Sequence, residues 1–81
     1  MKGTRKYPNK EGQLLLAEGE YGKDNTGTWY ARPPSSHIGS LSQHTVVEHE
    51  DGTITVSPSI LVSNTDSQWH GYLEKGIWRK A

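Results

Sequence analysis

A chain of 81 residues has room for a single small domain, and its composition excludes several classes of protein. It contains no cysteine, which excludes disulfide bonds and thiolate metal sites and suits a reducing cytoplasm. Nine basic and nine acidic side chains give a net charge of zero, which argues against a strongly basic nucleic-acid binder and against an acidic DNA mimic.

Residues 1–12 are polar and interrupted by glycine and proline. We interpret them as a flexible basic arm that precedes one small β domain over residues 13–81. Residues 13–21 (QLLLAEGEY) are ambiguous, because leucine, alanine and glutamate favour a helix whereas the run is short and bracketed by glycines. We predict a strand there, with a helical turn as the alternative. A polar loop leads to a second strand over 28–32, which Pro33-Pro34 ends because proline has no N–H to donate.

The strongest local signal is Asp51-Gly52, which separates two β-rich runs and is typical of a two-residue hairpin turn. A two-residue loop places Val47 opposite Val56 and His49 opposite Ile54. Alternation along a strand then predicts that these four side chains point into the core, with the residues between them on the other face.

The remaining residues predict further β segments. Residues 59–63 form a short apolar strand, and the polar residues 64–68 form a turn. A final hairpin pairs residues 69–73 with residues 77–80 about Lys75-Gly76. Together these patterns predict an all-β domain of about five to seven short strands, built from hairpins into a small antiparallel, ribbon-like sheet.

The order of residues in the second half of the chain resembles a group of small phage and prophage proteins of unknown function. The resemblance rests on DG-x-x-x-x-SPSI-x-V over residues 51–62, a polar turn, and then WHGYL followed by a glycine over residues 69–76. Members of that group resemble zinc ribbons and carry a C-P-x-C-G-H knuckle and a later Cys-His pair. Here residues 32–37 (RPPSSH) take the place of the knuckle and Trp69-His70 that of the later pair, so a proline and both histidines match while the cysteines are absent.

The resemblance implies a ribbon-like β fold in the cytoplasm of a bacterial host, without the metal ion that the cysteines would hold. We therefore expect no metal and no other cofactor, and we expect Trp69 to fill the vacated space. A structural zinc contributes about 10–16 kcal/mol in finger peptides, so the packing that replaces it has a large loss to offset. The sequence leaves open whether His37 and His70 meet.

No pattern of residues predicts catalysis. The histidines have no spacing that would bring three or four metal ligands together; they are His37, His44, His49 and His70. Residue types of a nucleophile triad are present in Ser57, Ser59, Asp66 and His70, but no G-x-S-x-G elbow holds a serine. The acidic residues at the hairpin tip are expected to be solvated; they are Glu48, Glu50 and Asp51. We predict a protein that is not an enzyme.

The last hairpin carries the most suggestive surface, because it interleaves aromatic rings with positive charges. Its candidate binding residues are Trp69, His70, Tyr72, Lys75, Trp78 and Arg79. Alternation predicts one face with His70 and Tyr72 and another with Leu73 and Trp78. Such a mixture suits a protein partner, since Tyr, Trp and Arg are enriched at interface hot spots, and it also suits single-stranded nucleic acid, whose bases stack on rings.

The neutral charge favours a protein partner over nucleic acid. We predict a small phage-type binding protein of the bacterial cytoplasm that occupies a host or phage protein, as a takeover factor or as an inhibitor of a defence system. The alternative is a nucleic-acid-binding ribbon that has lost its metal. No apolar run is long enough to cross a membrane, so we predict no membrane contact. The free strand edges of a small β domain also predict a homodimer.

Overall fold

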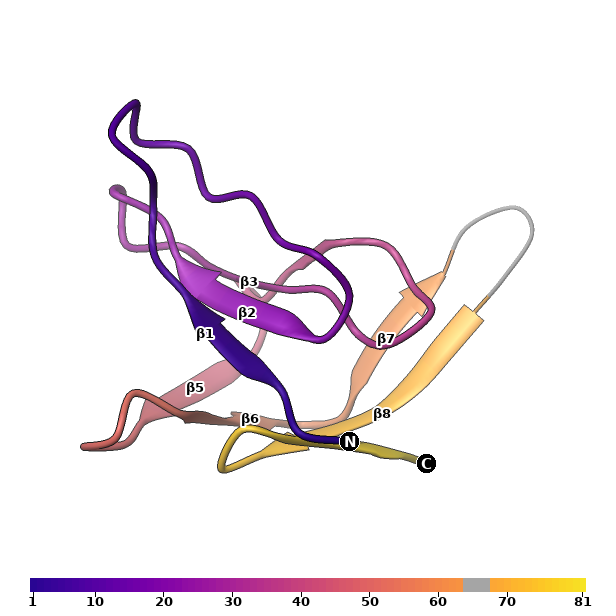
Figure 1. Cartoon of the computed structure of the whole chain (residues 1–81). Helices are drawn as coiled ribbons and strands as arrows, with labels where there is room; N and C mark the ends of the chain where they lie inside the picture. The colour runs from indigo at the N-terminus through magenta and orange to yellow at the C-terminus, as the bar shows by residue number, and fades with distance from the viewer. Residues whose placement is uncertain (64–67) are drawn as a thin grey trace.

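The computed structural model describes residues 1–63 and 68–81, and within them every regular element is a strand (Figure 1). In chain order the strands are β1 Thr4–Lys6, β2 Glu20–Lys23, β3 Trp29–Ala31, β4 Gly39–Ser40, β5 Thr45–Glu48, β6 Ile54–Ser57, β7 Ile60–Ser63, β8 Gln68–Glu74 and β9 Ile77–Lys80. The predicted all-β class is confirmed. The strands outnumber the prediction because β1 and the two-residue β4 form where no strand was expected. No helix in this described part of the chain has the length and apolar character to cross a membrane.

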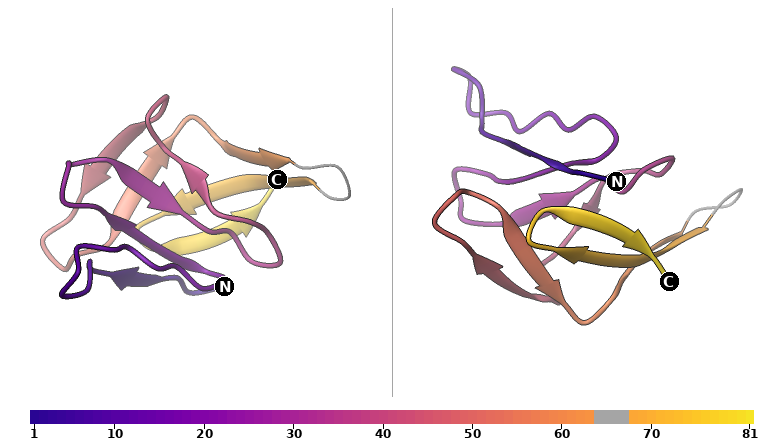
Figure 2. Two further views of the ribbon diagram at one scale, coloured as in Figure 1. Left: turned by 90° about the horizontal axis from the view of Figure 1, so that it is seen from above. Right: turned by 60° about the horizontal axis from the view of Figure 1, so that its bottom comes forward.

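The strands form three small sheets arranged around one core (Figures 1 and 2). The first sheet has the order β1-β2-β3-β4, the second contains β5 and β6, and the third has the order β7-β8-β9. β1 runs parallel to β2, and the other strand pairs are antiparallel. The predicted strands over 28–32 and 59–63 are confirmed as β3 and β7. Short turns favour this arrangement, because antiparallel neighbours can be joined by a tight hairpin.

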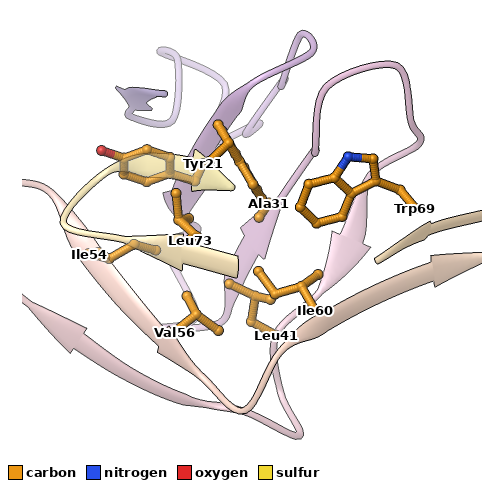
Figure 3. Packing of buried hydrophobic residues seen from close by; sticks show 9 residues of the cluster. Tyr21, Ala31, Leu41, Ile54, Val56, Ile60, Trp69 and Leu73 are labelled. Atoms are coloured by element: carbon orange, nitrogen blue, oxygen red, sulfur yellow. The ribbon is translucent and has the colours of Figure 1, made fainter. Parts of the chain in front are cut away.

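All three sheets contribute side chains to the core (Figure 3). Its buried members are Tyr21, Ala31, Leu41, Ile54, Val56, Ile60, Trp69, Leu73 and Trp78. The rings of Trp69 and Trp78 meet edge to face, with centroids 5.4 Å apart and planes at 90°, an arrangement that the charge distribution of aromatic rings favours. The indole N–H of Trp78 donates to the carbonyl oxygen of Gly19 at 2.9 Å, so its polar atom is satisfied inside the core.

The β5–β6 hairpin has a three-residue loop instead of the predicted two-residue turn. The main-chain N–H of His49 donates to the carbonyl oxygen of Thr53 at 2.8 Å, and Gly52 adopts a φ of 88°. This geometry is that of a type I turn followed by a bulge with a left-handed glycine. His49 was expected to face the core, but it lies just beyond the strand, where its Nε2 is 2.8 Å from Thr55 Oγ1.

The extra loop residue shifts β5 by one position relative to β6. Val46 lies opposite Val56, and Glu48 lies opposite Ile54. The prediction placed Ile54 and Val56 in the core correctly, but it also placed Val47 there, and that side chain remains 50% exposed. A shift of one residue moves every side chain of a strand to the opposite face, so the error in loop length fully explains this correction.

The first residues of the chain are joined to two of the sheets. β1 pairs with β2, and Lys2 forms an isolated antiparallel bridge with Ile77 of β9. The N–H of Gly3 donates to the carbonyl oxygen of Gly76 at 2.7 Å, and a β-carbon at position 3 would lie 2.8 Å from Trp78 Nε1. The division that placed residues 1–12 outside the domain therefore does not hold for residues 1–6. The flexibility of the segment stays a prediction.

Residues 13–21 form a strand only at their end, because β2 begins at Glu20. The three leucines that precede β2 pass over the first sheet and do not add a strand to that sheet. Leu16 is buried, Leu15 is 65% exposed, and Leu14 Cδ1 would lie 3.0 Å from a β-carbon at Gly22 of β2. Packing over a strand glycine thus replaces the expected sheet pairing.

The last hairpin forms as predicted. β8 and β9 pair with Leu73 opposite Trp78. Lys75 and Gly76 have φ values of 49° and 76°, and a type I′ turn requires positive φ at both central residues. Of the predicted turn over 64–68, residues 64–67 lie outside the described residues.

Candidate functional site

The six candidate binding residues of the last hairpin do not share one surface. Trp69 and Trp78 expose only 7% and 3% of their areas and belong to the core with Leu73. Alternate residues of a strand point to opposite faces, so both indoles face inward. They are therefore packing residues and are not available for the surface contacts predicted for them. Lys75 is exposed at the β8–β9 turn, where its main-chain N–H donates to Thr55 Oγ1 at 2.9 Å.

The opposite side of the β7-β8-β9 sheet faces away from the core and is called the outer face below. It carries His70 and Tyr72 of β8 beside Arg79 of β9. It also carries Leu61 of β7, which is 55% exposed, and Ile77 of β9, which is 46% exposed. The sequence reasoning missed these two aliphatic residues, although alternation along β7 and β9 was sufficient to find them.

Neighbouring groups hold the polar side chains of the outer face. The Arg79 guanidinium carbon lies 4.4 Å from the centroid of the Tyr72 ring, and Nη2 donates to Glu74 Oε1 at 2.8 Å. This hydrogen bond to Glu74 raises the pKa of Arg79. The Nε2 atom of His70 lies 2.8 Å from the hydroxyl oxygen of Ser59. On the outer face, His70, Arg79 and Glu74 therefore already have side-chain partners.

The histidines do not gather into a metal site among residues 1–63 and 68–81. His44 Nε2 donates to the carbonyl oxygen of Ser59 at 3.1 Å, and His70 Nε2 contacts the hydroxyl of the same serine. Each ring thus has one nitrogen engaged by Ser59. His37 is exposed in the loop before β4, and it shares no hydrogen bond with His70 in the described structure, which answers the question left open by the sequence.

The contact between Ser59 and His70 is not part of a complete nucleophile triad in the described residues. A histidine base needs a third group that orients its ring. No carboxylate in residues 1–63 or 68–81 bonds to the His70 ring, Ser57 is exposed in β6, and Asp66 lies outside the described part of the chain. The geometry gives no support to a hydrolytic site here.

The acidic residues at the β5–β6 turn make local contacts. Asp51 Oδ1 accepts hydrogen bonds from the hydroxyl of Thr53 at 2.6 Å and from its main-chain N–H at 3.0 Å, and these bonds lower the pKa of Asp51. Glu48 Oε2 accepts a bond from Arg5 Nη1 at 2.9 Å, which lowers the pKa of Glu48. Glu50 is exposed to solvent. These carboxylates support a turn and an ion pair rather than an ion site.

Arg5 is a contact residue that the sequence reasoning missed. Its guanidinium carbon lies 4.6 Å from the ring centroid of Tyr7 and 4.8 Å from that of Trp29. Its Nη1 also donates to the carbonyl oxygen of Gly52 at 2.9 Å. Glu48 and Gly52 follow Arg5 by 43 and 47 positions, so no local pattern could reveal this cluster.

Two clefts lie away from the outer face. One has a volume of about 280 Å³ and is lined by Gly27, Thr28, Trp29, Leu41, Ser42, His44 and Val46. The other has a volume of about 220 Å³ and is lined by Gly12, Leu14, Asp24, Tyr30 and Ile38. Neither brings together a set of groups with an evident chemical use.

Comparisons of the chain with protein-family models, with curated proteins and with solved structures give no match. They neither support nor oppose the resemblance to phage proteins of the zinc-ribbon type.

Proposed function

We propose that this protein is a non-enzymatic binding protein and that its outer face docks on another protein. The observation that carries the proposal is the exposure of Leu61 and Ile77 beside the stacked Tyr72 and Arg79 on one sheet face. Tyrosine and arginine are among the residue types that dominate interface hot spots, and nearby aliphatic groups help to exclude water from them. The combination suits a partner with a flat, mixed apolar and polar surface.

The fixed geometry of the polar groups supports the same proposal. Arg79 is held by Tyr72 and Glu74, and His70 is held by Ser59. Side chains that are already ordered lose less conformational freedom on association, so more of their contact energy appears as affinity. A rigid sheet also presents them at constant spacing.

The nature of the partner follows from the sequence resemblance alone. We propose a host or phage protein in the bacterial cytoplasm, with the chain acting as an inhibitor or takeover factor by occupying its surface. The alternative function, binding of single-stranded nucleic acid, draws on the exposed Arg79 stacked on Tyr72. The contact of that arginine with Glu74 favours the protein partner, since the carboxylate would repel a phosphate.

The test is affinity capture from bacterial lysate with the intact protein and with a Tyr72→Ala/Arg79→Ala variant. The matched control is Leu15→Ala, which alters a 65% exposed leucine in the loop before β2. We expect one protein to be retained by the parent and the control, with an affinity for the double variant weaker by roughly tenfold or more. Equal retention by all three proteins would remove the outer face from the proposal.

The nucleic-acid alternative has its own test. A mobility shift with single-stranded DNA and RNA is measured at low and at moderate salt, with the same variants. Binding that falls steeply with salt and is lost in Tyr72→Ala/Arg79→Ala would favour the alternative, because phosphate contacts release counterions. We expect no shift at either salt concentration.

A further inference from the structure

The edge strand β5 presents hydrogen-bonding groups that no other strand uses. The bond from the N–H of His49 to the carbonyl of Thr53 at 2.8 Å fixes the pattern of the β5–β6 ladder. Bonded and non-bonded pairs alternate along antiparallel strands, so Val47 is the next residue of β5 that bonds to β6. The N–H and C=O groups of Val46 and Glu48 therefore point away from β6. No main-chain bond in the described chain engages them.

Several of the other sheet edges are covered by main-chain bonds, charged or very short. The first three residues of the chain cover β9. The main-chain N–H of Gly3 donates to the carbonyl oxygen of Gly76, and the main-chain N–H of Trp78 donates to that of Met1, both at 2.7 Å. The carbonyl of Ser59, just before β7, accepts a bond from His44, and the carbonyl of Ile54 on β6 accepts a bond from the main-chain N–H of Gly76 at 3.0 Å. β1 carries positive side chains, and β4 has only two residues.

β5 itself lacks the features that protect sheet edges. Its four residues, TVVE, include no lysine, proline or glycine, and its pairing with β6 contains no bulge within the strand. The outer side chain at its centre is Val47, which is 50% exposed. An unprotected, β-branched edge is a template for another strand.

We propose that β5 pairs with β5 of a second copy of the chain, antiparallel and about a two-fold axis at Val47. In this register the main-chain N–H and C=O of Val46 on one copy bond to those of Glu48 on the other copy. The two-fold axis repeats this pair with the copies exchanged, so all the outward groups of both residues are hydrogen-bonded. The two Val47 residues then form a non-bonded pair, whose side chains approach closely on one face. The surface is self-complementary, as a two-fold interface requires.

Charge does not oppose this pairing. Glu48 is the only ionisable residue within β5, and Arg5 holds its carboxylate at 2.9 Å. The interface is small, because a four-residue strand buries far less than the roughly 1,200 Å² of a standard complex. We therefore expect a weak dimer that forms reversibly at high concentration. This inference concerns a surface other than the outer face and does not depend on the proposed function.

The absence of native cysteine gives a direct test, since a Val47→Cys variant has one thiol per chain. In a non-bonded antiparallel pair the two thiols would meet across the axis and form a disulfide on mild oxidation. Leu61→Cys is the matched control, because Leu61 is similarly exposed and also lies on an edge strand. We expect the Val47→Cys protein to cross-link at least about tenfold faster than the control, since pairing raises the effective thiol concentration. An equal or slower rate would overturn the proposal.

A second measurement avoids the new thiol. Sedimentation equilibrium of the unmodified protein up to about 1 mM should show association, and Val47→Lys should abolish it by placing two positive charges on the axis. The Leu61→Lys variant should associate like the parent. A parent that stays monomeric over the whole range, or a Val47→Lys protein that associates as before, would contradict β5 pairing.

Discussion

At the scale of single residues, two aspartates perform the same local task in different turns. Asp24 Oδ1 accepts bonds from the hydroxyl of Thr26 at 2.6 Å and from its main-chain N–H at 2.9 Å. Asp51 repeats the arrangement with Thr53. The bonds from the threonine hydroxyls are the main reason why the pKa of each aspartate is lowered. Both carboxylates are therefore more acidic in the folded chain than in the unfolded one.

The lowered pKa values of Asp24 and Asp51 predict that the folded protein loses stability in acid. A carboxyl whose pKa is depressed by folding stabilises the native state above its unfolded value, near pH 4, and that stabilisation is lost as the pH falls through the folded pKa. We expect the melting temperature to be flat above about pH 5 and to fall progressively below pH 4. Thermal melts followed by circular dichroism from about pH 7 down to about pH 2 measure the effect.

The matched variant is Asp24→Asn/Asp51→Asn. An asparagine oxygen still accepts the bonds from threonine but does not titrate. We expect the acid-induced decrease in melting temperature to be smaller in this variant, with Glu48 responsible for part of the remainder. Parallel curves for the two proteins would show that these aspartates do not control the acid response.

At the scale of elements, the β5–β6 hairpin shows what local sequence could and could not determine. The Asp51-Gly52 signal located the turn correctly, because a glycine free to adopt positive φ is needed there. It did not determine the loop length, since both two-residue and three-residue hairpins use glycine at a left-handed position. The resulting error of one residue put Val47 in the core and left Val46 outside it. Type and position of an element followed from sequence, whereas register required the turn geometry.

The turn geometry predicts the effect of changes at Gly52. Alanine is strained at a φ of 88°, whereas asparagine tolerates the left-handed region better. We expect Gly52→Ala to lower the free energy of unfolding by about 1–2 kcal/mol and Gly52→Asn to lower it by less. Urea denaturation of the three proteins provides the comparison. A Gly52→Ala protein as stable as the parent would mean that the bulge is placed wrongly.

At the scale of the whole molecule, contacts between distant segments complete the fold. The two termini of the sequence lie together, because residues 1–3 pair with β9. Arg5 links the first sheet to the β5–β6 hairpin through Glu48 and Gly52. Neither connection leaves a periodic signal in a polar stretch of sequence, which is why residues 1–12 were predicted to lie apart. The same limit applied to the candidate site. Alternation assigned the faces of the last hairpin correctly, but Trp69 and Trp78 were predicted to bind a partner although they pack in the core.

The Arg5 cluster can be tested by Arg5→Met, which keeps a long apolar stem and removes the guanidinium. The side chain is only 12% exposed, so its loss removes partly buried contacts with Tyr7, Trp29 and the Gly52 carbonyl. We expect the free energy of unfolding to fall by about 1–3 kcal/mol. Arg79→Met is the control, since the pair of Arg79 with Glu74 is 60% and 53% exposed and should matter much less. Equal losses in the two variants would contradict a structural role for Arg5.

The resemblance to zinc ribbons also makes a prediction about the whole molecule. The sequence predicts that Trp69 fills the space of the absent metal, so we expect a chelator to leave the melting temperature unchanged. Elemental analysis of the purified protein should find far less than one zinc per chain. A melting temperature that drops after chelation, or stoichiometric zinc, would show that the chain binds metal after all.

The perpendicular pair of Trp69 and Trp78 has a practical consequence. The two indoles are held 5.4 Å apart at 90°, and we expect them to couple electronically and to give a paired positive and negative band in the ultraviolet circular dichroism spectrum. Because one ring comes from β8 and the other from β9, the band would vanish when that hairpin separates. The molecule thus contains an intrinsic optical reporter of its own interior, which needs no dye or label.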